Sequence, residues 1–89
     1  MRGMTGTDAD CRQTVILLAA IDAMEGTLSV AEALLARRRA VDLAGLDREI
    51  GRLCVAVLAA PRSAAPALRP RLESLKRVHD RLAAALAPP

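Results

Sequence analysis

Apolar residues recur at alternating steps of four and three in the first half of the chain, and this spacing limits the fold more than any other feature. The positions are Leu17, Ile21, Met24, Leu28, Ala31 and Leu35. The spacing places them on one side of an α-helix, in the a/d rhythm of a helix that packs against another. It predicts a helix over about residues 9–39. Residues 1–7 have no periodicity and predict a flexible N-terminal tail, with Thr7 or Asp8 as the helix cap.

Two further apolar stripes follow the same rhythm. Asp42 is expected to cap a second helix over about residues 43–59. Its stripe is Leu43, Leu46, Ile50, Leu53 and Val57. The Pro- and Ala-rich residues 59–67 predict a loop, and Pro70 fits the first turn of a third helix over 68–87. The stripe of that helix is Leu68, Leu72, Leu75, His79, Leu82 and Leu86.

The composition agrees with a fold made of helices. The chain has 89 residues, of which 53% are hydrophobic, and it contains no Phe, Tyr or Trp. Alanine and leucine, the strongest helix formers, supply most of the apolar surface. We therefore predict an all-α fold, a small antiparallel helical bundle or helical hairpin of about three helices in a single domain over 8–87. The join at 40–42 is so short that the first two helices could also be continuous.

Three consecutive arginines, Arg37, Arg38 and Arg39, stand where the first stripe ends. Cations suit the last turn of a helix, because they meet the negative end of the helix dipole there. The run could also contact phosphates, but no aromatic residue interleaves it and the net charge of +3 is modest. We favour the first interpretation.

Residues that could carry chemistry are few. The chain has one histidine, His79, and two cysteines, Cys11 and Cys54, at no metal or redox spacing. We interpret both cysteines as small buried side chains and His79 as a residue of a helix face. No nucleophile elbow, P-loop or dinucleotide fingerprint is present. The sequence predicts a protein that is not an enzyme and needs no cofactor or metal.

The chain is expected to be a soluble protein of the cytoplasm. Its apolar run Val15–Ile21 is too short to span a bilayer and stops at Asp22. A signal peptide and membrane insertion are therefore not expected. Free cysteines also suit a reducing compartment.

Residues 36–58 and 68–86 contain a short Asp-Leu join, a helix with leucines at steps of three and four, and a closing Leu-rich helix. The segments are Ala40-Val41-Asp42-Leu43-Ala44-Gly45-Leu46, then Ile50 and Leu53, then Leu68-Arg69-Pro70-Arg71-Leu72-Glu73-Ser74-Leu75. In these features the chain resembles the FlgN/FliT-type flagellar export chaperones. The resemblance implies a cytoplasmic chaperone that binds the C-terminal helical segment of hook–filament junction proteins before export.

The expected mode of binding is a partner helix laid into an apolar groove. The third helix is the expected docking face, because a short bundle would not fully bury three stripes. Its candidate partner-binding residues are Leu72, Leu75, Val78, Leu82 and Leu86. The alternative for the same residues is the core of the chain itself or of a homodimer.

Two other functions remain open at this point. The chain could be a small homodimeric helical adaptor. It could also be a weakly basic nucleic-acid-binding protein that lays its third helix along phosphates. The basic residues of that helix are Arg69, Arg71, Lys76, Arg77 and Arg81.

Overall fold

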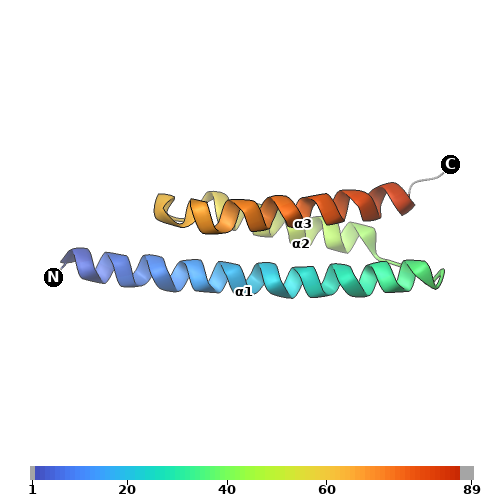
Figure 1. The fold of residues 1–89 in the computed structure, drawn as a ribbon, viewed down its shortest axis with the longest axis horizontal. Coiled ribbons are helices and arrows are strands. Elements are labelled where there is room, and N and C mark those ends of the chain that lie inside the picture. The colour runs from blue at the N-terminus through green and yellow to red at the C-terminus, as the bar shows by residue number, and fades with distance from the viewer. Residues whose placement is uncertain (1, 87–89) are drawn as a thin grey trace.

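The chain folds into three helices arranged along one axis (Figure 1). The computed structural model describes residues 2–86, with side chains from Ala9 to Leu86. Helix α1 (Arg2–Ala36) is the longest, α2 (Leu43–Leu58) runs back along it, and α3 (Ala65–Leu86) turns again and lies parallel to α1. A short 3-10 helix, η1 (Arg62–Ala64), joins α2 to α3. The predicted all-α bundle of three helices is confirmed.

The three stripes meet in one core between the helices. The buried side chains are Leu17, Ile21, Met24, Leu28, Ala31, Leu46, Ile50, Leu53, Ala64, Leu68, Leu75 and Leu82. All except Ala64 lie on the predicted stripes. Leu35, Val57, Leu72 and Leu86 are half-buried and pack against this core, and the remaining stripe members, Leu43 and His79, are half-buried as well. Burying a leucine stabilises the fold by roughly 1.5–3 kcal/mol, so these stripes are the main source of stability.

The arginine run forms the turn that ends α1. Arg38 has a φ of 58°. Its N–H donates to the carbonyl of Leu35 at 2.9 Å, and the N–H of Arg39 donates to the carbonyl of Leu34 at 2.8 Å. This pair of bonds is a Schellman motif, which satisfies the last carbonyls of a helix. The helix therefore ends at Ala36, before the predicted residue 39, and the arginines follow the last turn instead of occupying it.

Helix α2 begins as predicted. The Asp42 side chain accepts a hydrogen bond from the N–H of Gly45 at 3.0 Å, which satisfies one of the unpaired donors at the start of the helix. The non-helical join between Ala36 and Leu43 separates α1 from α2, so the two are not continuous.

Other boundaries differ from the predictions. Helix α1 begins at Arg2, so residues 2–7 and Asp8 belong to the helix; they are neither a tail nor a cap. This first part of α1 projects beyond the other two helices (Figure 1). Residues 2–7 carry no apolar periodicity that could have revealed this part of the helix. The predicted end of the third helix at residue 87 lies outside the described residues.

The loop between α2 and α3 is shorter than predicted. Helix α3 begins at Ala65 instead of residue 68, since η1 leads into it directly. Pro66 therefore occupies the first turn, and Pro70 lies inside the helix. Proline has no N–H, so α3 lacks one backbone hydrogen bond at Pro70.

Candidate protein-binding surface

Helix α1 carries apolar residues on two opposite sides. One side is the core stripe. The other is a second stripe with alternating steps of three and four, displaced by two residues, or about 200° around the helix, from the first. Its members are Ile16, Ala19, Ala23, Gly26, Val30 and Ala33, all of them exposed. We call this set the outer face of α1. Ile16 is 61% exposed and Val30 60%, so large apolar side chains on this face lie in solvent.

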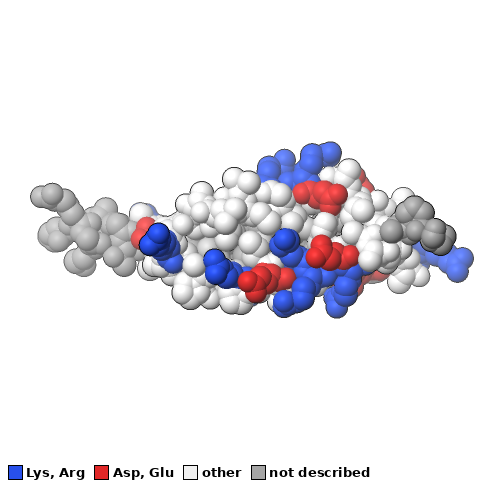
Figure 2. All heavy atoms as spheres, turned by 90° about the horizontal axis from the view of Figure 1, so that it is seen from above, with Lys and Arg blue, Asp and Glu red and all other residues white. Residues whose placement is uncertain are grey.

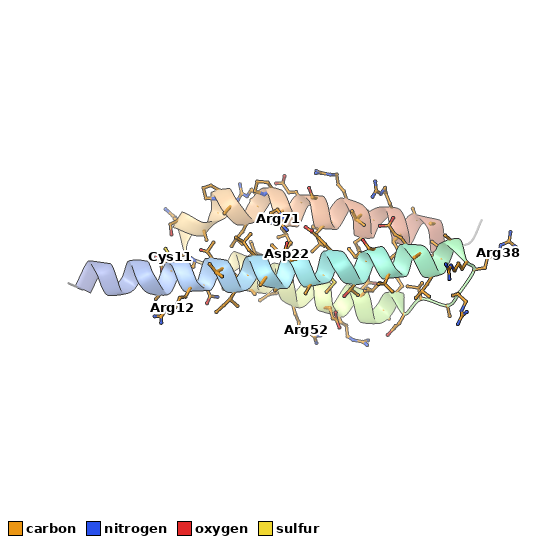
Figure 3. All side chains as sticks on the ribbon, turned by 60° about the horizontal axis from the view of Figure 1, so that its bottom comes forward. Cys11, Arg12, Asp22, Arg38, Arg52 and Arg71 are labelled. Atoms are coloured by element: carbon orange, nitrogen blue, oxygen red, sulfur yellow. The ribbon has the colours of Figure 1, made fainter. Side chains whose placement is uncertain are left out.

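The charged residues of α1 leave the outer face free. Between Gln13 and Ala36 they are Asp22, Glu25 and Glu32. Arg71 of α3 forms ion pairs with Asp22 and with Glu25, the latter at 3.2 Å, so these carboxylates lie on the flank toward α3 (Figure 3). Glu32 lines the shallow grooves between α1 and α3.

The ion pairs with Asp22 and Glu25 favour the charged form of the Arg71 guanidinium. The hydrogen bond to Asp22, followed by the bond to Glu25, raises the pKa of Arg71 above its ordinary value. Both partners are partly open to solvent, since Arg71 is 39% exposed and Glu25 42%. Surface pairs of this kind contribute little to stability, so their main effect is to hold the carboxylates on the α3 side.

Arginines mark both ends of the outer face. Arg12 lies four residues before Ile16, and Arg37 four residues after Ala33, so both continue the spacing of the stripe. Both are exposed. In Figure 3, Arg12 points away from α3. The outer face is thus an uncharged strip with a cation at each end.

A shallow groove runs beside the outer face, between α1 and α2. Its volume is about 260 Å³, and it is lined by Thr27, Val30, Ala31, Leu34, Ala40, Val41, Asp42, Gly45, Leu46 and Glu49. Most of these side chains are apolar or small. Val30 belongs to both the groove and the outer face, so the two form one surface.

The residues predicted to bind a partner lie elsewhere. Leu75 and Leu82 are 1% and 2% exposed and belong to the core. Leu72, Val78 and Leu86 are half-buried and pack against it. The three stripes are thus only partly buried, as expected of a short bundle, but Leu75 and Leu82 are among their buried members, because η1 returns α3 onto α1 and α2. A partner could reach Leu75 or Leu82 only if the bundle opened.

The remaining chemistry-bearing side chains have structural surroundings. His79 Nε2 lies 2.5 Å from Asp47 Oδ1 and joins α3 to α2, while its Nδ1 lies 3.8 Å from Asp80. Cys54 is half-buried, but Cys11 is exposed, so the prediction that both cysteines are buried is wrong for Cys11. It lies before the first core residue of α1, where no helix covers it. Within residues 9–86, no three His, Cys, Asp or Glu side chains gather as metal ligands would.

The basic residues of α3 do not form an uninterrupted cationic surface. Arg71 is paired with carboxylates of α1, and Arg77 donates a hydrogen bond to Ser74. Figure 2 views the side formed by α2 and α3, where acidic and basic side chains lie among one another. Glu73 and Asp80 are exposed on the same helix as these arginines. Acidic side chains thus interrupt the basic residues of α3.

The length and composition of Ala9–Ala36 in α1 would allow this segment to cross a membrane. The core helix of a soluble protein passes the same test, and one side of this segment forms the bundle core. No family model, curated protein or solved structure matches the chain.

Proposed function

We propose that this chain is a non-enzymatic helical module that binds an amphipathic helix of a protein partner. The observation that carries the proposal is the outer face of α1, which stays uncharged and exposed from Ile16 to Ala33. A helix that is apolar on two opposite sides is normally buried on both, and here the other two helices cover only one. Exposed apolar residues that gather on one face are typical of interaction sites.

The specific partner that we propose is the C-terminal helical segment of hook–filament junction proteins, bound in the cytoplasm by a flagellar export chaperone-like protein. The resemblance of the α2 and α3 sequences to the FlgN/FliT type supports this choice. The groove between α1 and α2 supports binding of a partner helix in an apolar groove. A helix that lay on the outer face would also cover Val30 and Leu34, which line this groove. The docking face proposed here is that of α1, since the apolar face of α3 is taken up by the core.

The test is a titration of the purified chain with peptides of those C-terminal helical segments, followed by calorimetry. Val30→Asp places a charge in the middle of the outer face, and Val55→Asp is the matched control. Val55 lies on α2 and is 67% exposed, against 60% for Val30, so both changes should leave the fold intact. We expect the peptides to bind the wild type and the control, and Val30→Asp to lose binding.

Two other results would point to the other candidate functions. A stable dimer in sedimentation equilibrium that Val30→Asp dissociates would indicate the homodimeric adaptor. An affinity for nucleic acid that falls steeply with salt would indicate phosphate binding. Either result, together with no binding of the peptides, would contradict the proposed function.

A further inference from the structure

We infer that the outer face of α1 binds a single partner helix that carries carboxylates at both ends of its contact, opposite Arg12 and Arg37, and that this helix does not come from a second copy of the chain. The inference rests on the proposed function and adds the chemistry of the partner to it.

The spacing of the outer face indicates that the occupant is a helix. Its members alternate in steps of three and four from Ile16 to Ala33. This is the a/d rhythm by which one helix receives the side chains of another. In the middle of the face, an added Cβ at Gly26 would meet nothing within 4 Å, so the surface there is open. The large side chains of Ile16 and Val30 stand on either side of this opening.

The charges of the surface favour an acidic match at each end. Arg12 and Arg37 lie roughly 37 Å apart at 1.5 Å of rise per residue, and the strip between them is uncharged. At the Arg37 end, Arg38 and Arg39 outnumber the nearby carboxylate of Asp42, so this end stays positive. Complementary charges at an interface contribute to specificity and register more than to affinity.

The charged residues beside the outer face do not change the expected charge of the partner. At the other end, Asp10 lies seven residues before Leu17 and so follows the core stripe, not the outer face. Asp8 lies four residues before Arg12 on the line of the outer face, one turn beyond the strip, so Arg12 is the charge next to the strip and the charge of Asp8 opposes it in part. On the α2 side, Glu49 and Arg52 carry opposite charges only three residues apart. Together they favour neither a positive nor a negative partner residue near the middle of the face.

A second copy of the chain would meet like charges in either direction. An antiparallel pair of α1 helices that matched the stripes would place Ile16 opposite Ala33, and therefore Arg12 opposite Arg37. A parallel pair would place each arginine opposite its own copy. Like charges directly across an interface oppose association. The occupant is therefore a helix of another protein.

A lipid surface fits the face less well. Helices that lie on membranes present Trp, Phe or Leu on their apolar side. Four of the six members of the outer face are Ala or Gly, and the chain has no aromatic residue at all. The small residues suit close approach of another helix better than insertion among acyl chains.

The test uses two designed amphipathic peptides of about 28 residues, long enough to cover the strip. Both carry Leu at their a and d positions; one has Glu at the two ends and the other Lys. Binding is followed by fluorescence anisotropy of labelled peptide. We expect the Glu-ended peptide to bind at least ~10-fold more tightly than the Lys-ended one. The double variant Arg12→Glu/Arg37→Glu should reverse this preference.

The matched control is Arg69→Glu/Arg77→Glu, which changes two exposed arginines of α3. It alters the net charge equally but should leave the preference unchanged. Circular dichroism checks that each variant is helical. Sedimentation equilibrium and vesicles of phosphatidylcholine and phosphatidylglycerol test the other two occupants.

Four results would each overturn the inference. The two peptides could bind equally, or the control variant could reverse the preference as well. The chain could form a dimer, or bind vesicles, in a way that Val30→Asp abolishes. The proposed function fails separately. If junction-protein peptides bind and Val30→Asp abolishes the binding, but Arg12→Glu/Arg37→Glu does not weaken it, the function stands and the charge inference falls. If no helical peptide binds, the proposed function and the charge inference are both wrong.

Discussion

Replacing Arg38 with glycine should stabilise the protein, although it removes a side chain. Arg38 occupies the left-handed region at a φ of 58°. An L-residue pays roughly 1–2 kcal/mol there, because its Cβ approaches the following carbonyl oxygen. Glycine avoids this cost but has more freedom in the unfolded chain, which costs about 0.5–1 kcal/mol on folding. The difference predicts that Arg38→Gly raises the free energy of unfolding by about 0.5–1 kcal/mol.

Urea unfolding followed by circular dichroism measures this change, and thermal unfolding should show a rise in Tm of roughly 2–8 °C for a domain of this size. Arg39→Gly is the matched control. It removes the same side chain from the same turn, but Arg38 is the only non-glycine residue with positive φ between residues 2 and 86. The control should therefore lower stability by about 0.4–1 kcal/mol. Equal effects at the two positions, or a loss at Arg38, would refute the reasoning from backbone conformation.

Four further results are expected. Gly26→Ala should raise the unfolding free energy by roughly 0.8–1 kcal/mol in urea titrations, since the added methyl group meets open space. Gly45→Ala should gain less or nothing, because its Cβ would overlap the carboxylate that caps α2. Leu75→Ala should cost about 2–5 kcal/mol, whereas Leu58→Ala, at a side chain 84% exposed, should stay within about 0.5 kcal/mol. Arg71→Met should lower Tm in low salt, and the difference from wild type should shrink in about 1 M salt if exposed ion pairs cause it.

The core could be read from the sequence because stripe spacing and burial have the same physical cause. Leu17, Ile50 and Leu68 were each placed correctly by their steps of three and four. The helix boundaries could not be read in the same way. The first turns of α1, near Arg2, carry no apolar stripe, and the end of α1 depends on a left-handed residue that is arginine where glycine is usual.

The candidate surface was missed for a different reason. The core stripe that contains Leu17 is enough to predict the helix. The alanines on the opposite side are then read as ordinary helix formers, not as part of a surface. A signal was nevertheless present, because Ile16 and Val30 continue a second stripe that avoids Asp22 and Glu25. The choice of Leu75 as a docking residue assumed that it would be among the stripe members that a short bundle leaves accessible. Whether that holds depends on how the α2–α3 connection folds back, which spacing does not reveal.

The contact of Arg71 with Asp22 and Glu25 bears on the alignment of α1 along its neighbours. A stripe that repeats every seven residues packs almost as well after α1 slides by one repeat, so apolar burial alone leaves several alignments close in free energy. A slide of that length toward the C-terminal end of α1 would bring Val15 and Leu18 to the places of the two carboxylates and leave the guanidinium facing apolar side chains. A slide in the opposite direction would bring Ser29 and Glu32 there, so one of the two carboxylates would be lost. Exposed ion pairs add little to the free energy of unfolding. They can therefore still decide which of several alignments of α1, close to one another in free energy, is the native one.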